Sequence, residues 1–435
     1  MVYPLEAIAR SVEPDRHAWS LARRIAFRFA CVYLVLYLSD GWLQLLPAGG
    51  ATIDRWRQML GLWTGRHILH ITTEIDVHRF GTGSGDTLLD YIRVLNDLAI
   101  ASVATLVWSL AVGRRRDPPA LHQWLRVYVR YPLGIIMLGY GMAKVFPGQF
   151  GTGILPLDRL LEPYGHSSPM GILWTFMGYS RPYAIFCGLA EVVGGLLLFW
   201  QRTTTLGALV VAASMANVVT LNFSYDVPVK LFSTHLFLLA VFLLLPDLGR
   251  LARVFVLNRP TAAAPERPPF TRVWPRRAAV AVKTLLIGFV LYQNTWPNVQ
   301  QARRPRTVNP RYGIYEVEAF TANGQLRPAT PMDGRRWRRL IVSESGGITV
   351  QTMDDAMTRF RARDDKEKHT YSLTTIFNPY DAITLTYSEP GPDQLLLTGT
   401  YQGEDISVQM RKTSVPPFLL ATRGFHWVSE YPYNR

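Results

Sequence analysis

The residues from Ala184 to Leu245 form an almost continuous apolar run. A helix that crosses a bilayer needs about 20 consecutive apolar residues, so this run indicates several adjacent membrane-spanning helices. Single ionisable or amide side chains interrupt the run, namely Glu191, Asn217, Asn222, Asp226, Lys230 and His235. An ionisable group at the centre of a bilayer costs about 2.5 to 3.5 kcal/mol. We therefore expect these side chains to face a packed interior, a partner or a cavity.

Apolar stretches divide the chain into a membrane part and a polar part. Seven of them precede Trp296, and most are long enough to span the hydrocarbon layer. We predict an all-α bundle of about seven transmembrane helices in residues 25–296, with long outer loops at 47–88 and 147–181. The predicted spans are Ile25–Leu46, Leu89–Val112, Val127–Phe146, Pro182–Trp200, Thr205–Leu221, Val229–Leu245 and Ala278–Tyr292.

The distribution of basic residues predicts how the bundle is oriented. Short cytoplasmic loops collect Lys and Arg, and the most basic connecting segments are 10–24, 114–130 and 250–277. Placing these segments inside the cell makes residues 1–24 cytoplasmic and makes residues 260–277 a Pro-rich cytoplasmic linker. After seven crossings, residues 310–435 are then extracytoplasmic.

The formal net charge of +14 is explained by this asymmetry, with anionic lipid headgroups as the counter-charge. We expect the lipid bilayer as a partner and no nucleic acid, because no basic patch on a recognisable nucleic-acid-binding fold is present. The two cysteines, Cys31 and Cys187, both lie in apolar spans. Disulfides are therefore not expected to stabilise the polar part.

After Pro310 apolar and polar residues alternate, with turn residues between short runs, which is typical of antiparallel β structure. Eight strands with short links predict a C-terminal β domain that is either an up-and-down barrel or a meander sandwich. Its interior would be a filled core or a site for a small apolar ligand. The predicted strands are Ile314–Phe320, Trp337–Ser343, Gly347–Met353, Ala356–Arg363, His369–Ile376, Asp381–Ser388, Gln394–Tyr401 and Asp405–Lys412.

Three segments of the membrane part resemble the DoxX-like family of bacterial integral membrane proteins. They are YGMAKVFPGQF (140–150), GLAEVVGGLLLFWQRTTTLGA (188–208) and NFSYDVPVKLFSTHLFLL (222–239). In that family a Gly-rich helix ending in Lys is followed by a helix with Glu and a Gly pair. The resemblance covers roughly residues 125–255 and implies a small helical bundle in the cell inner membrane. Some relatives are linked to quinone or thiosulfate redox systems.

The polar residues of the spans suggest a pocket in the outer leaflet. By the predicted topology the outer half of the spans holds Asp97, Lys144, Asn222, Asp226, Lys230 and His235, with Glu191 and Asn217 near mid-depth. In one interpretation Glu191 and His235, with Lys230, act on a quinone-like headgroup by proton exchange. In the other the same residues are structural: Asp226 caps a helix and pairs with Lys230, and Glu191 makes an interhelical hydrogen bond.

The first outer loop offers a weaker candidate site. His67, His70, Glu74 and His78 recur at spacings of three or four residues, which would place them on one face of a helix. A divalent metal could bind there. However, the β-branched residues between them favour a strand, which would scatter the side chains. We therefore predict no metal site.

Two functions follow from these patterns. The first is an accessory or ligand-binding component of a membrane redox or envelope system, with a membrane redox protein as partner. The second is an integral-membrane oxidoreductase or carboxylase-like enzyme that uses a quinone-like membrane-soluble cofactor. The sequence does not decide whether the protein is an enzyme.

Overall fold

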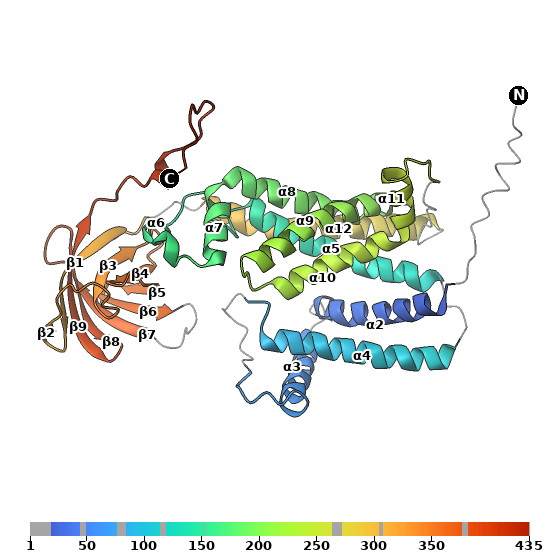
Figure 1. Cartoon of the computed structure of the whole chain (residues 1–435), viewed down its shortest axis with the longest axis horizontal. Helices are drawn as coiled ribbons and strands as arrows, with labels where there is room; N and C mark the ends of the chain where they lie inside the picture. Colours follow the sequence, from blue (N-terminus) through green and yellow to red (C-terminus); the bar gives the residue numbers. More distant parts are fainter. Residues whose placement is uncertain are drawn as a thin grey trace, which may run out of the picture.

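The computed structural model describes residues 19–43, 49–75, 84–113, 119–151, 153–262, 272–303, 308–375 and 382–434. These residues form a helical part, which ends at Arg303, and an antiparallel β part, which begins at Gly313. The β part lies beyond one end of the long helices, so the molecule is elongated (Figure 1). His78 and residues 263–271 of the predicted Pro-rich linker fall outside the described residues.

Each of the seven predicted spans is helical in the part of the chain that the structure describes. Five segments are long and apolar enough to cross a membrane: α4, α8, α9 with the turn before it, α10 through α11, and α12. The count of seven crossings therefore remains a prediction. The long helices are α2 (Leu21–Leu43), α4 (Leu88–Val112), α5 (Pro119–Val145), α8 (Arg181–Leu198), α9 (Thr204–Ser224), α10 (Lys230–Leu244) and α12 (Val273–Arg303).

Shorter helices connect or flank the long ones. The predicted first outer loop contains the helix α3, which lies across the direction of α2 and α4 (Figure 1). The short helices are α3 (Gly49–His67), α6 (Leu157–Leu161), α7 (Pro169–Tyr179), α11 (Leu248–Phe255) and α13 (Leu419–Thr422).

Glycines allow α5 and α8 to approach closely. A Cβ atom on Gly141 would lie 2.6 Å from the carbonyl oxygen of Gly188. Two turns away, a Cβ atom on Gly195 would lie 3.0 Å from the carbonyl oxygen of Gly134. Small residues at such crossings let helix backbones touch inside a membrane. The contact holds α5 and α8 together along much of their length.

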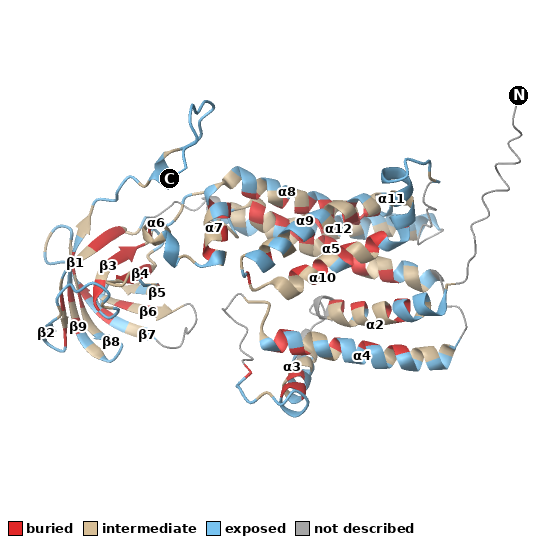
Figure 2. Cartoon of the chain, viewed as in Figure 1, coloured by how far each residue is buried: buried red, intermediate tan, exposed pale blue. Residues whose placement is uncertain are grey.

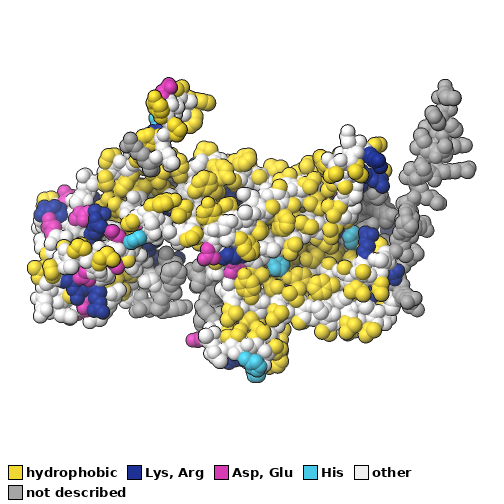
Figure 3. All heavy atoms as spheres, viewed as in Figure 1, with side chains coloured by type: hydrophobic (Ala, Val, Ile, Leu, Met, Phe, Trp, Pro, Cys, Tyr) yellow, Lys and Arg dark blue, Asp and Glu magenta, His cyan; other side chains and the backbone are white. Residues whose placement is uncertain are grey.

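The helical part exposes apolar side chains around its sides. Figure 2 shows buried residues where helices face one another and exposed residues on their outer faces. On α4 the exposed residues include Val103, Leu106, Val107 and Leu110, each at least 60% exposed. Hydrophobic side chains dominate this surface, whereas charged ones gather on the β part (Figure 3). An exposed apolar surface of this size fits a protein that lies in a membrane.

The β part is a closed antiparallel barrel. Strand β1 pairs with β3, the strands from β3 to β9 pair in order, and β9 pairs with β1, which closes the sheet and excludes the sandwich alternative. The eight predicted strands are all present, and the two-residue strand β2 was not predicted. The strands are β1 (Gly313–Ala322), β2 (Gln325–Leu326), β3 (Trp337–Val342), β4 (Ile348–Thr352), β5 (Met357–Asp365), β6 (Thr370–Thr375), β7 (Ala382–Ser388), β8 (Gln394–Tyr401) and β9 (Glu404–Thr413).

Large side chains fill the barrel. Phe320, Trp337, Tyr371, Leu385 and Val408 are each at most 1% exposed and belong to one contiguous apolar cluster. In a barrel of eight strands the interior is just wide enough for side chains to fill it. This arrangement favours a filled core over a ligand site.

The barrel is attached to the second outer loop through α6. Arg359 of β5 donates from Nε to the carboxylate of Asp158 at 2.5 Å and from Nη2 to Glu162 at 3.1 Å. Leu157 of α6 is buried in a cluster with Ile314 of β1. The contact combines apolar burial with two partly shielded ion pairs, so it links the barrel to the end of the bundle.

Candidate functional site

An ion pair joins α5 to α8 inside the helical part. The Nζ atom of Lys144 donates to Oε2 of Glu191 at 2.8 Å, and the two residues are 6% and 2% exposed. Arg181 donates to the carbonyl oxygens of Lys144 and Val145, which end α5. The positive charges of Arg181 and Lys144 thus also face the negative end of the helix dipole. Glu191 therefore makes an interhelical hydrogen bond, and its donor is the ammonium of Lys144.

A second polar contact joins α2 to α10. The Nδ1 atom of His235 lies 2.7 Å from the carbonyl oxygen of Leu231, and Nε2 lies 2.6 Å from the hydroxyl of Tyr33. A carbonyl can only accept, so Nδ1 donates, and in the neutral ring Nε2 then accepts from Tyr33. The ring of Tyr37 stacks on His235 with centroids 4.1 Å apart. The imidazole is therefore held in one orientation.

A third polar contact joins α3 to α4. Arg57 donates to the buried carboxylate of Asp97, and the two form an ion pair. Asp97 also interacts electrostatically with Tyr33 and His235. These four residues come from four helices and place a cation, an anion, a phenol and an imidazole in one region.

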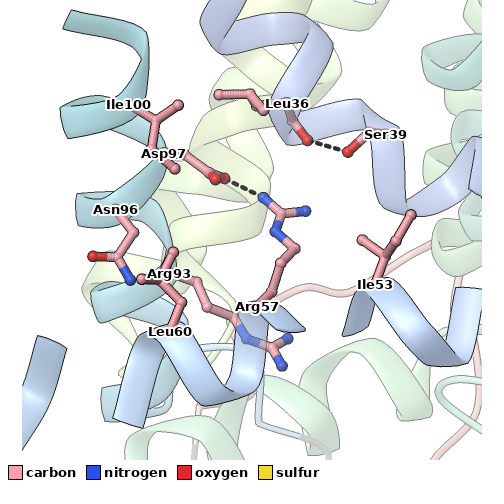
Figure 4. Close-up of a pocket in the computed structure, with 9 residues that line it drawn as sticks. All are labelled: Leu36, Ser39, Ile53, Arg57, Leu60, Arg93, Asn96, Asp97 and Ile100. Atoms are coloured by element: carbon pink, nitrogen blue, oxygen red, sulfur yellow. Dashed lines mark hydrogen bonds and ion pairs between the residues drawn. The ribbon is translucent and has the colours of Figure 1, made fainter. Parts of the chain in front are cut away.

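A cavity of about 160 Å³ lies beside this ion pair. Figure 4 shows Arg57 reaching across it from α3 toward Asp97 on α4. Its volume resembles that of an engineered cavity of about 150 Å³ that binds benzene, so it is large enough for one ring. Apolar and polar side chains from α2, α3 and α4 line it, namely Leu36, Ser39, Ile53, Arg57, Leu60, Arg93, Asn96, Asp97 and Ile100.

Two N–H donors at the cavity have no partner in the described part of the chain. They are Nε of Arg93 and Nδ2 of Asn96, both buried. Other atoms of the same side chains do have partners: Oδ1 of Asn96 accepts from the hydroxyl of Thr64 at 3.0 Å, and Nη2 of Arg93 pairs with Asp54 at 3.0 Å. A buried donor without a partner costs about 1 to 3 kcal/mol. A ligand with acceptor oxygens would satisfy both donors.

Four further candidates lie away from these contacts. Asn222 donates from Nδ2 to Ser233 at 3.0 Å, which joins α9 to α10. Asn217 lies on the exposed face of α9 and does not join a polar group in the described part of the chain. The predicted pair of Asp226 and Lys230 is present, with the charged atoms 2.7 Å apart.

The prediction that Asp226 caps the following helix is wrong. That helix, α10, begins at Lys230, and Asp226 has a positive φ of 50° three residues before the cap position. Asp86 caps the helix instead, accepting from the amides of Lys230 and Leu231 at 2.8 Å each. The cap comes from a residue that precedes α4, so it ties the two helices together.

The described histidines of the first outer loop do not form a cluster. His67 is the last residue of α3, and its ring stacks on Trp63. His70 has a positive φ of 51°, and Glu74 is exposed beyond the helix, while His78 lies outside the described residues. Within the described ranges no group of three or more His, Cys, Asp or Glu side chains is placed to hold a metal ion.

The predicted outer pocket is thus divided between helix pairs. Glu191 contacts Lys144 between α5 and α8, whereas His235 contacts Tyr33 between α2 and α10. Lys230 belongs to neither contact. Sequence reasoning missed the tyrosines of α2 and the residues that line the cavity, apart from Asp97. Tyr33 and Tyr37 are spaced one helical turn apart, and this spacing could have indicated from the sequence that both rings lie on one face of α2.

Comparison with known proteins gives one further finding. No family model and no solved structure matches the chain. The chain is 35% identical to Uncharacterized protein YwoB of Bacillus subtilis (strain 168) over 116 residues. The aligned residues make up 27% of this chain and 72% of YwoB.

This chain belongs to the YwoB family. Most of the chain lies outside the aligned residues, so YwoB corresponds to a part of it only. The name of YwoB assigns no activity, and membership of its family therefore adds none. The resemblance to DoxX-like proteins remains a prediction from the three sequence segments.

Proposed function

We propose that this YwoB-family protein is a multi-pass inner-membrane protein that binds a quinone-like headgroup, as an accessory component of a membrane redox or envelope system. The N-terminus would be cytoplasmic and the barrel extracytoplasmic. The main support is the cavity between α2, α3 and α4, whose wall holds the unpartnered donors of Arg93 and Asn96. Two carbonyl oxygens on a ring would match two N–H donors, and the apolar side chains would cover its faces.

The position of the cavity is consistent with a membrane-soluble ligand. The cavity lies where α3 crosses the ends of α2 and α4, and α3 exposes Trp56 and Trp63 at 66% and 52%. Exposed tryptophans are typical of the level of the lipid headgroups. A ligand with an apolar tail would place its ring in the cavity and its tail among lipids.

An enzyme is the second candidate, supported by the contact between Tyr33 and His235. A histidine hydrogen-bonded to a phenol can pass a proton, and Asp97 couples it electrostatically to the cavity wall. In this alternative the bound ring would be reduced or would act as a cofactor. The buried ion pair of Lys144 and Glu191 would then have a structural role and take no part in the reaction.

Binding of a short-chain benzoquinone to the purified full-length protein tests the proposal. Asn96→Asp keeps the acceptor for Thr64 but replaces the free Nδ2–H donor by an oxygen. We expect its affinity to fall about tenfold, the equivalent of one lost hydrogen bond. Arg55→Met, an exposed charge on α3, is the matched control and should bind as wild type does. Equal affinity in Asn96→Asp and wild type would refute this site.

A second variant of the full-length protein distinguishes the accessory role from the enzyme. His235→Gln removes the titrating ring outside the cavity wall. An accessory protein would bind the quinone with unchanged affinity and show no turnover in either form. Reduction of quinone by wild type with a suitable electron donor, abolished in His235→Gln with binding retained, would instead establish the enzyme.

A further inference from the structure

A cationic cluster lies at the end of the bundle opposite the barrel. Arg130 of α5 donates from Nη1 to the hydroxyl of Thr204 at 3.1 Å, and Thr204 donates to the carbonyl oxygen of Trp200 at 2.8 Å. Lys283 of α12 lies over the ring of Trp200, with Nζ 5.8 Å from its centroid. Lys283 and Arg130 also interact electrostatically. Three segments that are distant in sequence thus bring Arg130 to Thr204 and Lys283 to the indole of Trp200, four residues before Thr204.

Nothing in the described part of the chain neutralises these two charges. Arg130 contacts the neutral groups of Thr204 and Tyr131, and its Nε is buried without a partner. The single carboxylate in the described residues at this end is Asp247. It pairs with Arg126 and Arg250. The like charges of Arg130 and Lys283 therefore repel each other, one from α5 and the other from α12.

The repulsion acts on a helix that is weakly held. The apolar contact of α12 with α5 and α8 rests on few buried side chains, Ile287 and Val290 among them. Few side chains of α12 are buried, and Val282, Leu285 and Phe289 are each more than half exposed. A negatively charged group between Arg130 and Lys283 would attract both side chains and so offset their mutual repulsion.

We propose that the phosphate of an anionic phospholipid binds between Arg130, Lys283 and Trp200. The guanidinium of Arg130 and the ammonium of Lys283 would donate to its oxygens. The indole of Trp200, 48% exposed, would lie at headgroup depth, where tryptophan is enriched. The acyl chains would cover the exposed residues Val282, Leu285 and Phe289 of α12. A lipid fits this arrangement because the charges lie directly beside an apolar helix face.

The experiment measures how lipids bind to and stabilise the purified full-length protein. Native mass spectrometry gives the affinity for phosphatidylglycerol and phosphatidylcholine, and thermal unfolding in detergent reports stabilisation by each. We expect preference for phosphatidylglycerol and a loss of about fivefold in its affinity for each charge removed. Lys283→Gln should show one such loss, and Arg130→Gln with Lys283→Gln should show two. Lys283→Arg, which keeps the charge, should bind as wild type does.

Matched controls separate this site from general attraction to basic surfaces. Arg253 is exposed on α11 at the same end of the bundle, so Arg253→Gln should leave the affinity unchanged. Should the double variant unfold, the comparison of Lys283→Gln with Lys283→Arg gives the answer. Equal affinity for both lipids, or equal losses in Lys283→Gln and Arg253→Gln, would overturn the proposal. Equal stabilisation by inorganic phosphate would also overturn it, because the site would then bind a free anion.

Discussion

The ammonium of Lys144 and the carboxylate of Glu191 form a buried ion pair where the backbones of α5 and α8 come closest. Gly141 is one turn before Lys144, and Gly188 is one turn before Glu191. Close packing and charge pairing therefore occur at the same point of the interface. The glycines bring the helices together, and the ion pair restricts their register.

Removing the charge of Glu191 should destabilise the bundle. Glu191→Gln leaves Lys144 buried without a counter-charge, and breaking such a pair costs about 3 to 5 kcal/mol. Replacing both residues, as in Lys144→Met with Glu191→Leu, should recover much of this loss. The free energy of unfolding in detergent is the measurement. A Gln variant as stable as wild type would mean that Lys144 is neutral or finds another acceptor.

The cap on α10 can be tested with two variants that both affect Lys230. Asp86→Ala removes the acceptor of two amides and should lower stability by about 0.5 to 2 kcal/mol. Asp226→Ala removes only an ion-pair partner whose side chain is 82% exposed, and such pairs contribute little. Hydrogen exchange of the first turn of α10 should therefore rise in Asp86→Ala alone. Equal exchange in the two variants would contradict the assignment of the cap.

The barrel should fold without the helices. Its apolar cluster is formed by its own strands, and a fragment of residues 308–435 contains no cysteine. We expect β-type circular dichroism and a cooperative melt that reducing agent leaves unchanged. An unfolded fragment would show that the contact of α6 with Arg359 and Ile314 is part of the core.

The same fragment should lose stability at alkaline pH. Burial raises the pKa of Tyr315 to about 12, and its hydroxyl donates to the carbonyl oxygen of Arg311 at 3.0 Å. Above pH 10 the unfolded chain loses this proton while the folded one keeps it, so the stabilisation is lost as the pH rises from 10 to 12. The loss should be about 2 kcal/mol for this residue. Tyr315→Phe should flatten that part of the stability profile, and an unchanged slope would contradict the role of Tyr315.

Reporter fusions test the predicted topology. Fusions after Arg116 and Pro268 should report the cytoplasm, and fusions after Gly83, Gly165 and Arg435 should report the outside. The reason is the concentration of Arg and Lys in the predicted inner segments. A cytoplasmic signal at Arg435 would mean that α12 does not cross the membrane.

Local patterns were sufficient to predict most of the secondary structure. Alternation in the C-terminal part identified all eight barrel strands, and Gln394–Tyr401 matches β8 at both ends. Each predicted span is a helix, because a long apolar run must satisfy its own backbone hydrogen bonds in lipid. β2 was not predicted because a strand of two exposed residues is too short to show an alternation of apolar and polar side chains.

The candidate site depended on contacts between distant segments. The sequence marked Glu191 and His235 as unusual, because ionisable residues are costly in an apolar run. It could not show that Lys144 pairs with Glu191, or that His235 contacts Tyr33, 202 residues away. It also misassigned the cap of α10 to Asp226, since a nearby Asp before a Pro is the usual local signal.

The sequence by itself determined that apolar helices precede an antiparallel β domain, because residue periodicity and length decide which elements can be buried. Only the tertiary structure decided which partner each buried polar group has. It also decided that the β sheet closes and that a cavity remains beside Asp97. Pairing of this kind depends on helix crossings and strand closure, which bring together residues far apart in the chain and leave no local pattern.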